Sequence, residues 1–545
     1  MNKFSPFLAI LLLISTLVFS QKLSKDFKIS TASPYGVIDA QSKEYVSIGK
    51  GIVIMAKIDG EIVYLQKFNS NTMKEEGRNM YKDFPKYTKF QEIIKLEDRV
   101  YYLYHVYEKK EKRFKLYSRE INTSNASFKS PVLLFTTSRK ISGLPGSGDL
   151  AESNLGSVGM FSFGGFGSGK KFMTYKSFDE SKVMINYRCY PINKDDSQNY
   201  DELGFYVFDN TMKKIWGKEV KMPYTEDKMN NVAYAVSNTG EAVMLAALND
   251  KKEYAYYKIN SSGKLNTTNT GISTDDKVRY MVMQEDEKGN FLCGGYYANG
   301  VEFGFFKGLS TNYNGLMYFE ITKDGKVIRN EKYDFSEAFI QQNLSDRQKK
   351  KIEKREDKGK AGIFDLVLTD FVIKADGSIY FIGERQDIVS TTYTSGTSTR
   401  TKTTYYFTNV IVIKVENNGK LGWMKKLPKY QYGARGVGQM SIAYLEGKNA
   451  DYVAYVDNPK NISLSPTDGV PAKHADGLGG FLTTYKIDHA TGKLEKHTIC
   501  DLKEINGYVA YQFKTSRILK VSEGVFLMEI YIKKKKDTMV KFELN

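Results

Sequence analysis

The chain has 545 residues, with 80 Lys or Arg and 63 Asp or Glu, so its formal net charge is +17. Apolar residues make up 41% and charged residues 26%, a globular balance that argues against a disordered or fibrous protein. The 4 His and 3 Cys argue against a His-rich metal centre and a disulfide-stapled scaffold, while 39 Tyr and 32 Phe favour strands.

Residues 1–20 are predicted to be a secretory signal peptide. Lys3 supplies the positive start, residues 7–19 are apolar, and Val18 and Ser20 stand at the −3 and −1 positions of a cleavage site before Gln21. The alternative is an uncleaved anchor, but this run is shorter than the roughly 20 residues that cross a bilayer. We therefore expect a secreted protein, in the periplasm or on the outer cell surface. Its mature chain, residues 21–545, has no transmembrane segment and a charge of +16 after loss of Lys3.

The three cysteines are Cys189, Cys293 and Cys500, an odd set that is widely spaced. Cys293 lies in an apolar run, where a buried thiol behaves as a small hydrophobic group. We expect structural free thiols, with one long-range disulfide as the alternative.

A strand–turn–strand phrase recurs along the chain. Its clearest copies are residues 257–265, 319–327, 413–421 and 485–494, each with a Gly in the turn, where hairpins require positive φ. Two further strands joined by a tight turn precede these copies, as around Gly240, Gly289 and Gly377. Four antiparallel strands per ~45–55 residues form the blade of a β-propeller.

The repeat predicts an all-β fold, a β-propeller of eight blades. The third strands are expected to end at Phe68, Ile121, Phe208, Ile259, Ile321, Val415, Ile487 and Phe542. The last copy, residues 538–544, leaves no room for a fourth strand, which residues 26–31 can supply, so strands from both termini would close the ring. Seven blades are the main rival, and two β-sandwich domains are a further alternative. We expect residues 21–545 to form a single domain.

Three insertions interrupt the repeat. Residues 142–171 are rich in Gly and Ser and are predicted to form a flexible loop. Residues 335–360 are predicted to contain the one inserted helix, with Ser345 or Asp346 as N-cap and Gly359 at its end. This charged helix is interpreted as a solvated cover of one propeller face, or alternatively as a partner-binding helix.

Residues 387–407 form the third insertion. Their Thr and Tyr content predicts a two-stranded ribbon between the second and third strands of the sixth blade. Such a ribbon can dock a protein or a glycan, because Tyr rings stack with little loss of entropy and Arg and Lys donate hydrogen bonds. The candidate binding residues are Tyr393, Arg400, Lys402, Tyr405 and Tyr406. The alternative is a solvent-facing decoration.

No catalytic or metal-binding residue is predicted. The histidines, His105, His474, His489 and His497, are dispersed, and the sequence has no H-E-x-x-H or C-x-x-C motif. The dense Lys block, residues 533–536, lacks any accompanying nucleic-acid-binding motif. We therefore expect no nucleic-acid partner, and a basic exported protein more plausibly meets acidic surface polymers or lipid head groups.

Residues 377–384, 409–423 and 455–461 resemble blocks of an uncharacterised family of exported bacterial proteins with propeller-like repeats. The resemblance covers roughly residues 360–465; it implies a bacterial envelope protein and brings no activity or site residue. The turn at Asp488, Thr491 and Gly492 also resembles quinoprotein-type propeller repeats. The Trp that follows such turns appears in a comparable place only once, as Trp423. We expect no cofactor.

The sequence therefore predicts a binding or scaffold protein of the bacterial cell envelope that contacts a protein or glycan partner through propeller loops. We expect binding rather than catalysis. The alternative is a polysaccharide hydrolase or lyase that uses acidic residues at the propeller centre. The ligand and the oligomeric state stay open.

Overall fold

A computed structural model of the chain describes residues 24–143, 171–193, 195–278, 281–299, 312–356, 361–395, 398–434, 438–467, 469–477 and 479–545. The predicted signal peptide lies outside the described residues, as do most of the insertion 142–171, the end of the insertion 335–360 and the turn of the ribbon at 396–397.

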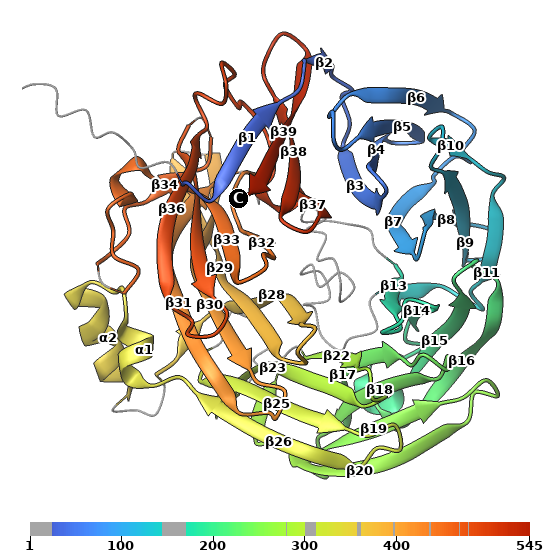
Figure 1. The fold of residues 1–545 in the computed structure, drawn as a ribbon. Coiled ribbons are helices and arrows are strands. Elements are labelled where there is room, and N and C mark those ends of the chain that lie inside the picture. The colour runs from blue at the N-terminus through green and yellow to red at the C-terminus, as the bar shows by residue number, and fades with distance from the viewer. Residues whose placement is uncertain are drawn as a thin grey trace, which may run out of the picture.

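The described residues form a β-propeller. Eight sheets of four or five strands follow one another around a common centre (Figure 1). In most sheets the main strands are hydrogen-bonded in chain order, whereas in the last sheet the N-terminal strand lies outside the C-terminal one. The predictions of an all-β fold and of propeller architecture are confirmed.

The first sheet consists of β3 (Ser42–Gly49), β4 (Ile52–Asp59), β5 (Ile62–Asn69) and β6 (Glu75–Tyr81), and the second consists of β7 (Lys89–Leu96), β8 (Arg99–Glu108) and β9 (Arg113–Asn122), with both β10 (Ser127–Phe128) and β11 (Val132–Thr136) paired to β9. In the third sheet, β12 (Ile141–Gly143) and β13 (Met173–Lys176) both pair with β14 (Lys182–Cys189), which is followed by β15 (Tyr200–Asp209) and β16 (Lys214–Thr225). The fourth sheet consists of β17 (Met229–Val236), β18 (Ala242–Leu248), β19 (Glu253–Ile259) and β20 (Leu265–Ser273).

In the fifth sheet, β21 (Asp276–Val278) and β22 (Val282–Glu285) both pair with β23 (Phe291–Asn299), which is followed by β25 (Gly315–Ile321) and β26 (Val327–Asp334). The sixth sheet consists of β28 (Leu366–Ile373), β29 (Ile379–Ser395), β30 (Ser398–Val415) and β31 (Leu421–Gly433), with β34 (His474–Ala475) parallel to β31. The seventh sheet consists of β32 (Ala443–Leu445), β33 (Ala450–Asp457), β35 (Phe481–Asp488) and β36 (Leu494–Asp501), and the eighth consists of β37 (Leu519–Ser522), β38 (Val525–Tyr531), β39 (Lys536–Leu544) and β1 (Phe27–Thr31), with β2 (Tyr35–Gly36) paired to β39. A two-stranded sheet joins β24 (Asn312–Tyr313) to β27 (Ile363–Phe364), and short 3-10 turns are η3 (Asp196–Gln198), η4 (Pro459–Asn461) and η5 (Thr515–Arg517).

The predicted strand ends fall in the third strand of each large sheet: Phe68 in β5, Ile121 in β9, Phe208 in β15, Ile259 in β19, Ile321 in β25, Val415 in β30, Ile487 in β35 and Phe542 in β39. The N-terminal strand β1 pairs antiparallel with β39, with Phe27 opposite Leu544 and Thr31 opposite Val540. Strands from the two ends of the described chain therefore share the last sheet.

The core lies between neighbouring sheets. Second strands such as β18 are buried along almost their whole length, because sheets pack against both of their faces. One apolar cluster joins the first and last sheets, with Val53 and Phe68 packed near Leu527 and Met539.

The recurrent turn glycines also have a packing role. Gly325 has φ +89°, and a Cβ placed on it would lie 2.7 Å from Cβ of Thr268 on the outer strand of the preceding sheet. Gly492 meets Trp423 of the preceding sheet in the same way. The repeated glycines thus let each turn approach the neighbouring sheet.

The expectation of a single inserted helix is wrong, because the segment holds two, α1 (Glu337–Gln341) and α2 (Asp346–Glu356). Asn343 has φ 61° and turns the chain between them. Ser345 begins α2: its carbonyl accepts from the Lys349 amide at 2.9 Å, and its own amide donates to Gln348 Oε1 at 2.9 Å. Within the described ranges neither helix has the length and apolar character to cross a membrane.

Candidate functional site

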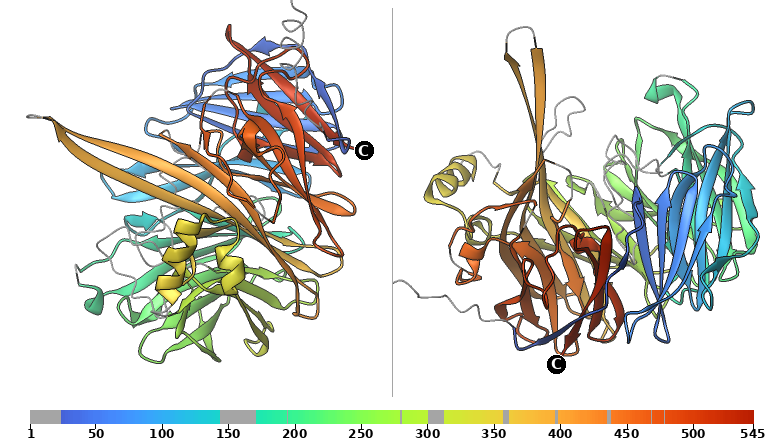
Figure 2. Two further views of the ribbon diagram at one scale, coloured as in Figure 1. Left: turned by 90° about the vertical axis from the view of Figure 1, so that its left-hand side faces the viewer. Right: turned by 90° about the horizontal axis from the view of Figure 1, so that it is seen from above.

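The two ends of the sheets carry different connections. In antiparallel sheets the turn from the first to the second strand and the turn from the third to the fourth lie at the same end. Here these are short turns such as those at Gly240 and Gly419. The opposite end carries the segment with α1 and α2, the segment 458–480 and the ribbon, which rises from the same side as the helices (Figure 2). We call this end the loop-bearing face.

The ribbon is the outward continuation of β29 and β30. Strand β28 pairs with β29 only as far as Arg385, and β31 pairs with β30 only as far as Tyr405. Beyond these points β29 and β30 pair with each other up to Ser395 opposite Ser398. The outer edges of residues 387–395 and 398–404 therefore have no partner strand within the described part of the chain.

The two faces of the ribbon differ in chemistry, because successive side chains of a strand alternate between them. One face carries a double row of hydroxyls from Ser390, Thr392, Thr394, Thr399, Thr401 and Thr403, whose cross-strand oxygen–oxygen distances are 2.9, 3.1 and 3.5 Å. On the other face Tyr393 lies opposite Arg400, and Thr391 lies opposite Lys402. The Tyr393 side chain is half exposed, at 50%.

The five predicted binding residues do not form one cluster. Tyr393, Arg400 and Lys402 lie on the projecting part of the ribbon, whereas Tyr405 and Tyr406 lie at its base, opposite residues of β31. The Tyr406 ring stacks on Tyr432 with 6.3 Å between ring centroids. The projecting residues are thus free to contact a partner, and the two base tyrosines pack within the sheet.

A buried ion pair fixes the base of the ribbon. Lys429 Nζ lies 2.6 Å from Glu384 Oε1, and both side chains are fully buried. Burial lowers the pKa of Lys429, and the Glu384 carboxylate acts in the opposite direction. Ser441 Oγ donates to the second oxygen of Glu384 at 2.7 Å, and Lys429 Nζ donates to the Phe407 carbonyl at 3.0 Å. The root of the ribbon is therefore held by Lys429 of β31 and by Ser441 of the segment before β32.

A second buried lysine, Lys426, anchors the helical segment to β31. Lys426 Nζ on β31 donates to the carbonyls of Ile340 at 2.8 Å and Gln342 at 2.9 Å, at the C-terminal end of α1. A cation at this end is favourable because the last carbonyls of a helix lack partners within it. Asn343 Nδ2 also donates to the Gly469 carbonyl at 3.2 Å, which joins the helices to the segment 458–480.

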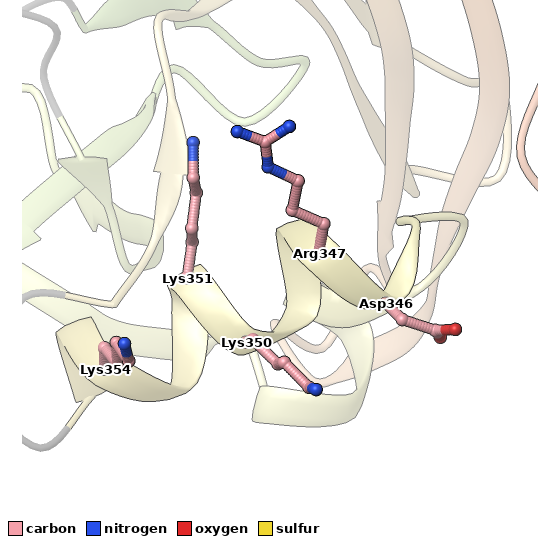
Figure 3. Close-up of a pocket in the computed structure, with 5 residues that line it drawn as sticks. All are labelled: Asp346, Arg347, Lys350, Lys351 and Lys354. Atoms are coloured by element: carbon pink, nitrogen blue, oxygen red, sulfur yellow. The ribbon is translucent and has the colours of Figure 1, made fainter.

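The exposed side of α2 borders a hollow of about 410 Å³ on the loop-bearing face. Among the described residues, those that line it are Asp346, Arg347, Lys350, Lys351 and Lys354. Figure 3 shows Arg347 and Lys351 extending in the same direction from the helix, and Lys350 extending to the other side. Four cations and one carboxylate give this hollow a strongly positive character.

The centre of the propeller offers one perturbed carboxylate near the ribbon sheet. Asp370 lies on the innermost strand β28, and burial, with the nearby Glu384 carboxylate, raises its pKa to about 7. Glu384 itself is sealed from solvent and paired with Lys429. The two carboxylates therefore do not both face a ligand.

His105 and the three cysteines occupy buried positions. His105 is buried at 3% exposure, and burial lowers its pKa to about 3. Cys189, Cys293 and Cys500 are buried free thiols, as predicted. Among the described residues, no three His, Cys, Asp or Glu side chains gather in a way that could hold a metal ion.

Sequence reasoning missed the buried charges, including Glu384, Lys426 and Lys429. They belong to no motif, so their partners emerge only when the sheets are assembled. The α2 cations carried a signal, since residues 349–360 are dense in charge, but their association with a hollow did not follow from it.

No family model matches the chain, and no curated protein matches it. Solved propellers do match. The Dos1 propeller is 8% identical and covers 95% of this chain and 96% of its own, with a TM-score of 0.38. The propeller domain of the Trilobed protease from Pyrococcus furiosus is 8% identical, covering 86% and 98%, with a TM-score of 0.33. An uncharacterized protein from Listeria monocytogenes is 11% identical, covering 85% and 97%, with a TM-score of 0.33.

Proposed function

We propose that the protein is a non-enzymatic binding scaffold of the bacterial cell envelope, which contacts a partner protein through the loop-bearing face and chiefly through the ribbon. The observation that carries the proposal is the pair of unpartnered edges on β29 and β30 beyond Arg385 and Tyr405. An open strand edge is a template for a further strand, and β-strand addition is a common mode of peptide recognition.

The edge of β29 is the better template. Residues 388–395 contain no charged residue and no Pro, and Ile388, Val389 and Tyr393 are exposed at 50%, 42% and 50%. Natural edges are usually protected by Lys, Pro or a bulge. Residues 398–404 carry Arg400 and Lys402 and are protected in this way. We infer that an extended polypeptide segment covers the β29 edge and that Tyr393 contacts its side chains.

We further infer that the propeller has eight blades and that the N- and C-terminal strands close it. Support comes from the pairing of β1 with β39 and from the apolar cluster between the first and last sheets. A closed ring has no free blade at which the array can open, and this gives the ribbon a rigid base.

Export belongs to the same proposal. We infer cleavage near Ser20 and a location in the periplasm or on the outer cell surface, because residues 1–20 have the pattern of a signal peptide. Mass spectrometry of the protein recovered from the envelope should give Gln21 as the first residue, and retention of Met1 would contradict export by this route.

The alternative of a polysaccharide hydrolase or lyase has less support. Glycosidases place two carboxyl groups on either side of the scissile bond. Of the neighbouring acids Asp370 and Glu384, the second is fully buried against Lys429. We therefore favour binding.

The test replaces residues 389–404 with Asn-Gly, which joins the register pair Ile388 and Tyr405 by a two-residue hairpin turn. Tagged wild-type protein, this shortened variant and the double variant Tyr393→Ala/Arg400→Ala are used for affinity capture from the native envelope. We expect an unchanged circular dichroism spectrum, a partner captured by the wild type, no capture by the shortened protein and reduced capture by the double variant. Equal recovery of the partner with the shortened protein would remove the ribbon from the proposal.

A further inference from the structure

We propose that the exposed side of α2 is a docking surface for an acidic polysaccharide, separate from the ribbon. Helix α2 has eleven residues, of which six are cations and three are acids. Arg347, Lys350, Lys351 and Lys354 line the hollow, and Asp346 is the one acid among its described lining residues.

The positive charges on this side of α2 lack compensation within the described residues. Arg347 and Lys351 are four positions apart and extend the same way (Figure 3), an arrangement of like charges that weakens a helix by about 0.2–0.5 kcal/mol. Within the described part of the chain, none of the four lining cations forms an ion pair with a carboxylate. An anionic ligand would supply the missing charge.

Helix α2 is anchored to the rest of the protein by side-chain contacts. Ile352 is turned inward and is 7% exposed, and the Arg355 guanidinium lies 4.2 Å from the centroid of the Phe364 ring. Lys426 and the contact from Asn343 to Gly469 fix the preceding turn. The cations therefore extend from an anchored element, so a ligand need not order the helix in order to bind.

The chemistry of this side of α2 favours one class of ligand. Lipid docking by a helix requires apolar side chains that enter the bilayer, and protein interfaces have an apolar or aromatic centre. On α2 the apolar Ile352 faces the protein, and the residues that line the hollow within the described ranges are all charged. Lys ammonium groups are strongly hydrated point charges that do not demand a fixed geometry. A hydrated polymer with repeated carboxylate or sulfate groups fits such a surface.

The test uses the full mature chain and an alginate oligosaccharide as the probe, with neutral dextran of equal length for comparison. Binding is measured by calorimetry at low and at physiological salt for the wild type and for Arg347→Gln/Lys350→Gln/Lys351→Gln/Lys354→Gln. The matched control, Lys533→Gln/Lys534→Gln/Lys535→Gln/Lys536→Gln, removes the same number of exposed cations from the turn before β39 and the first residue of that strand.

We expect salt-sensitive binding of alginate, no binding of dextran, affinity about tenfold lower for the α2 variant and affinity within about twofold of wild type for the control. Circular dichroism should show that both variants keep the fold. Equal losses in the two variants would overturn the proposal, because they would show a response to net charge alone. Absence of alginate binding at low salt would also overturn it. So would equal or tighter binding, through the same four cations, of phosphatidylglycerol vesicles, polyglutamate or single-stranded DNA.

Discussion

Lys57 Nζ lies 2.6 Å from Glu529 Oε1, and this buried ion pair joins residues that are 472 positions apart in the sequence. Lys57 belongs to β4 of the first sheet, and Glu529 belongs to β38 of the last sheet. Tyr35 and Tyr45 donate their hydroxyls to the same carboxylate at 2.7 and 2.8 Å, and Lys43 Nζ lies 2.9 Å from it. A polar cluster therefore reinforces the apolar contact between the first and last sheets.

Removal of one partner of this pair should destabilise the protein strongly. We predict that Lys57→Met lowers the free energy of unfolding by about 3 kcal/mol, because the Glu529 carboxylate stays buried with one ammonium fewer. Urea unfolding monitored by Tyr and Trp fluorescence measures the loss. Lys57→Met/Glu529→Leu should recover part of it, since two apolar groups then replace the pair. A single variant as stable as wild type would show that the pair does not join the sheets.

The same cluster predicts a dependence on pH. Burial alone would raise the pKa of Glu529, but the ammonium groups of Lys57 and Lys43 outweigh it and lower the pKa from 4.5 to about 2. A carboxyl group with a lowered pKa in the folded protein contributes its full stabilisation above pH 4.5 and loses it as the pH falls towards 2. We predict that urea unfolding between these values shows a steeper loss of stability for the wild type than for Glu529→Gln. Parallel curves would contradict the prediction.

The turn glycines predict a second pair of variants. Gly325 and Gly60 both have positive φ, but a Cβ on Gly325 meets Thr268 and Tyr256, whereas a Cβ on Gly60 meets nothing within 4 Å. We expect Gly60→Ala to cost about 1 kcal/mol from backbone strain alone, and Gly325→Ala to cost about 1–3 kcal/mol more from overpacking. Thermal unfolding of both variants measures the difference. Equal costs would mean that the turn does not pack against the preceding sheet.

Much of the fold was predictable because the repeat has a local cause. Strand alternation and the Gly turns are set by neighbouring residues, and so the eight third-strand ends, from Phe68 to Phe542, could be located in the sequence. The break between α1 and α2 was not found, since an Asn such as Asn343 adopts positive φ without a distinct sequence signal.

The candidate site was less predictable because its chemistry depends on contacts between distant segments. The ribbon followed from Thr and Tyr content, but Tyr405 and Tyr406 were indistinguishable in sequence from Tyr393, although they pack at its base. The ion-pair partner of Glu384 is Lys429, 45 positions away, and Lys426 donates to the Ile340 carbonyl, 86 positions away. No local pattern identifies such pairs.

The contact between Lys426 and helix α1 gives a further prediction. Lys426→Met keeps the length of the side chain but removes the donor to the carbonyls of Ile340 and Gln342. We predict that the amides of α1 exchange with solvent at least about tenfold faster. A tenfold increase corresponds to a free energy of local opening that is about 1.4 kcal/mol smaller. Hydrogen-exchange mass spectrometry measures this, with peptides from β18 as the internal control. Unchanged exchange in α1 would show that Lys426 does not hold the helix.

The most direct test of the central claim, that a partner strand covers the ribbon, is photo-crosslinking in the native envelope. A photoreactive amino acid is placed at Tyr393 on the ribbon or, as the control, at Asn418 in a short turn at the opposite end of the same sheet. We predict that position 393 yields a discrete adduct with one partner protein and that position 418 does not. An adduct of equal yield from both positions, or none from position 393, would contradict the claim.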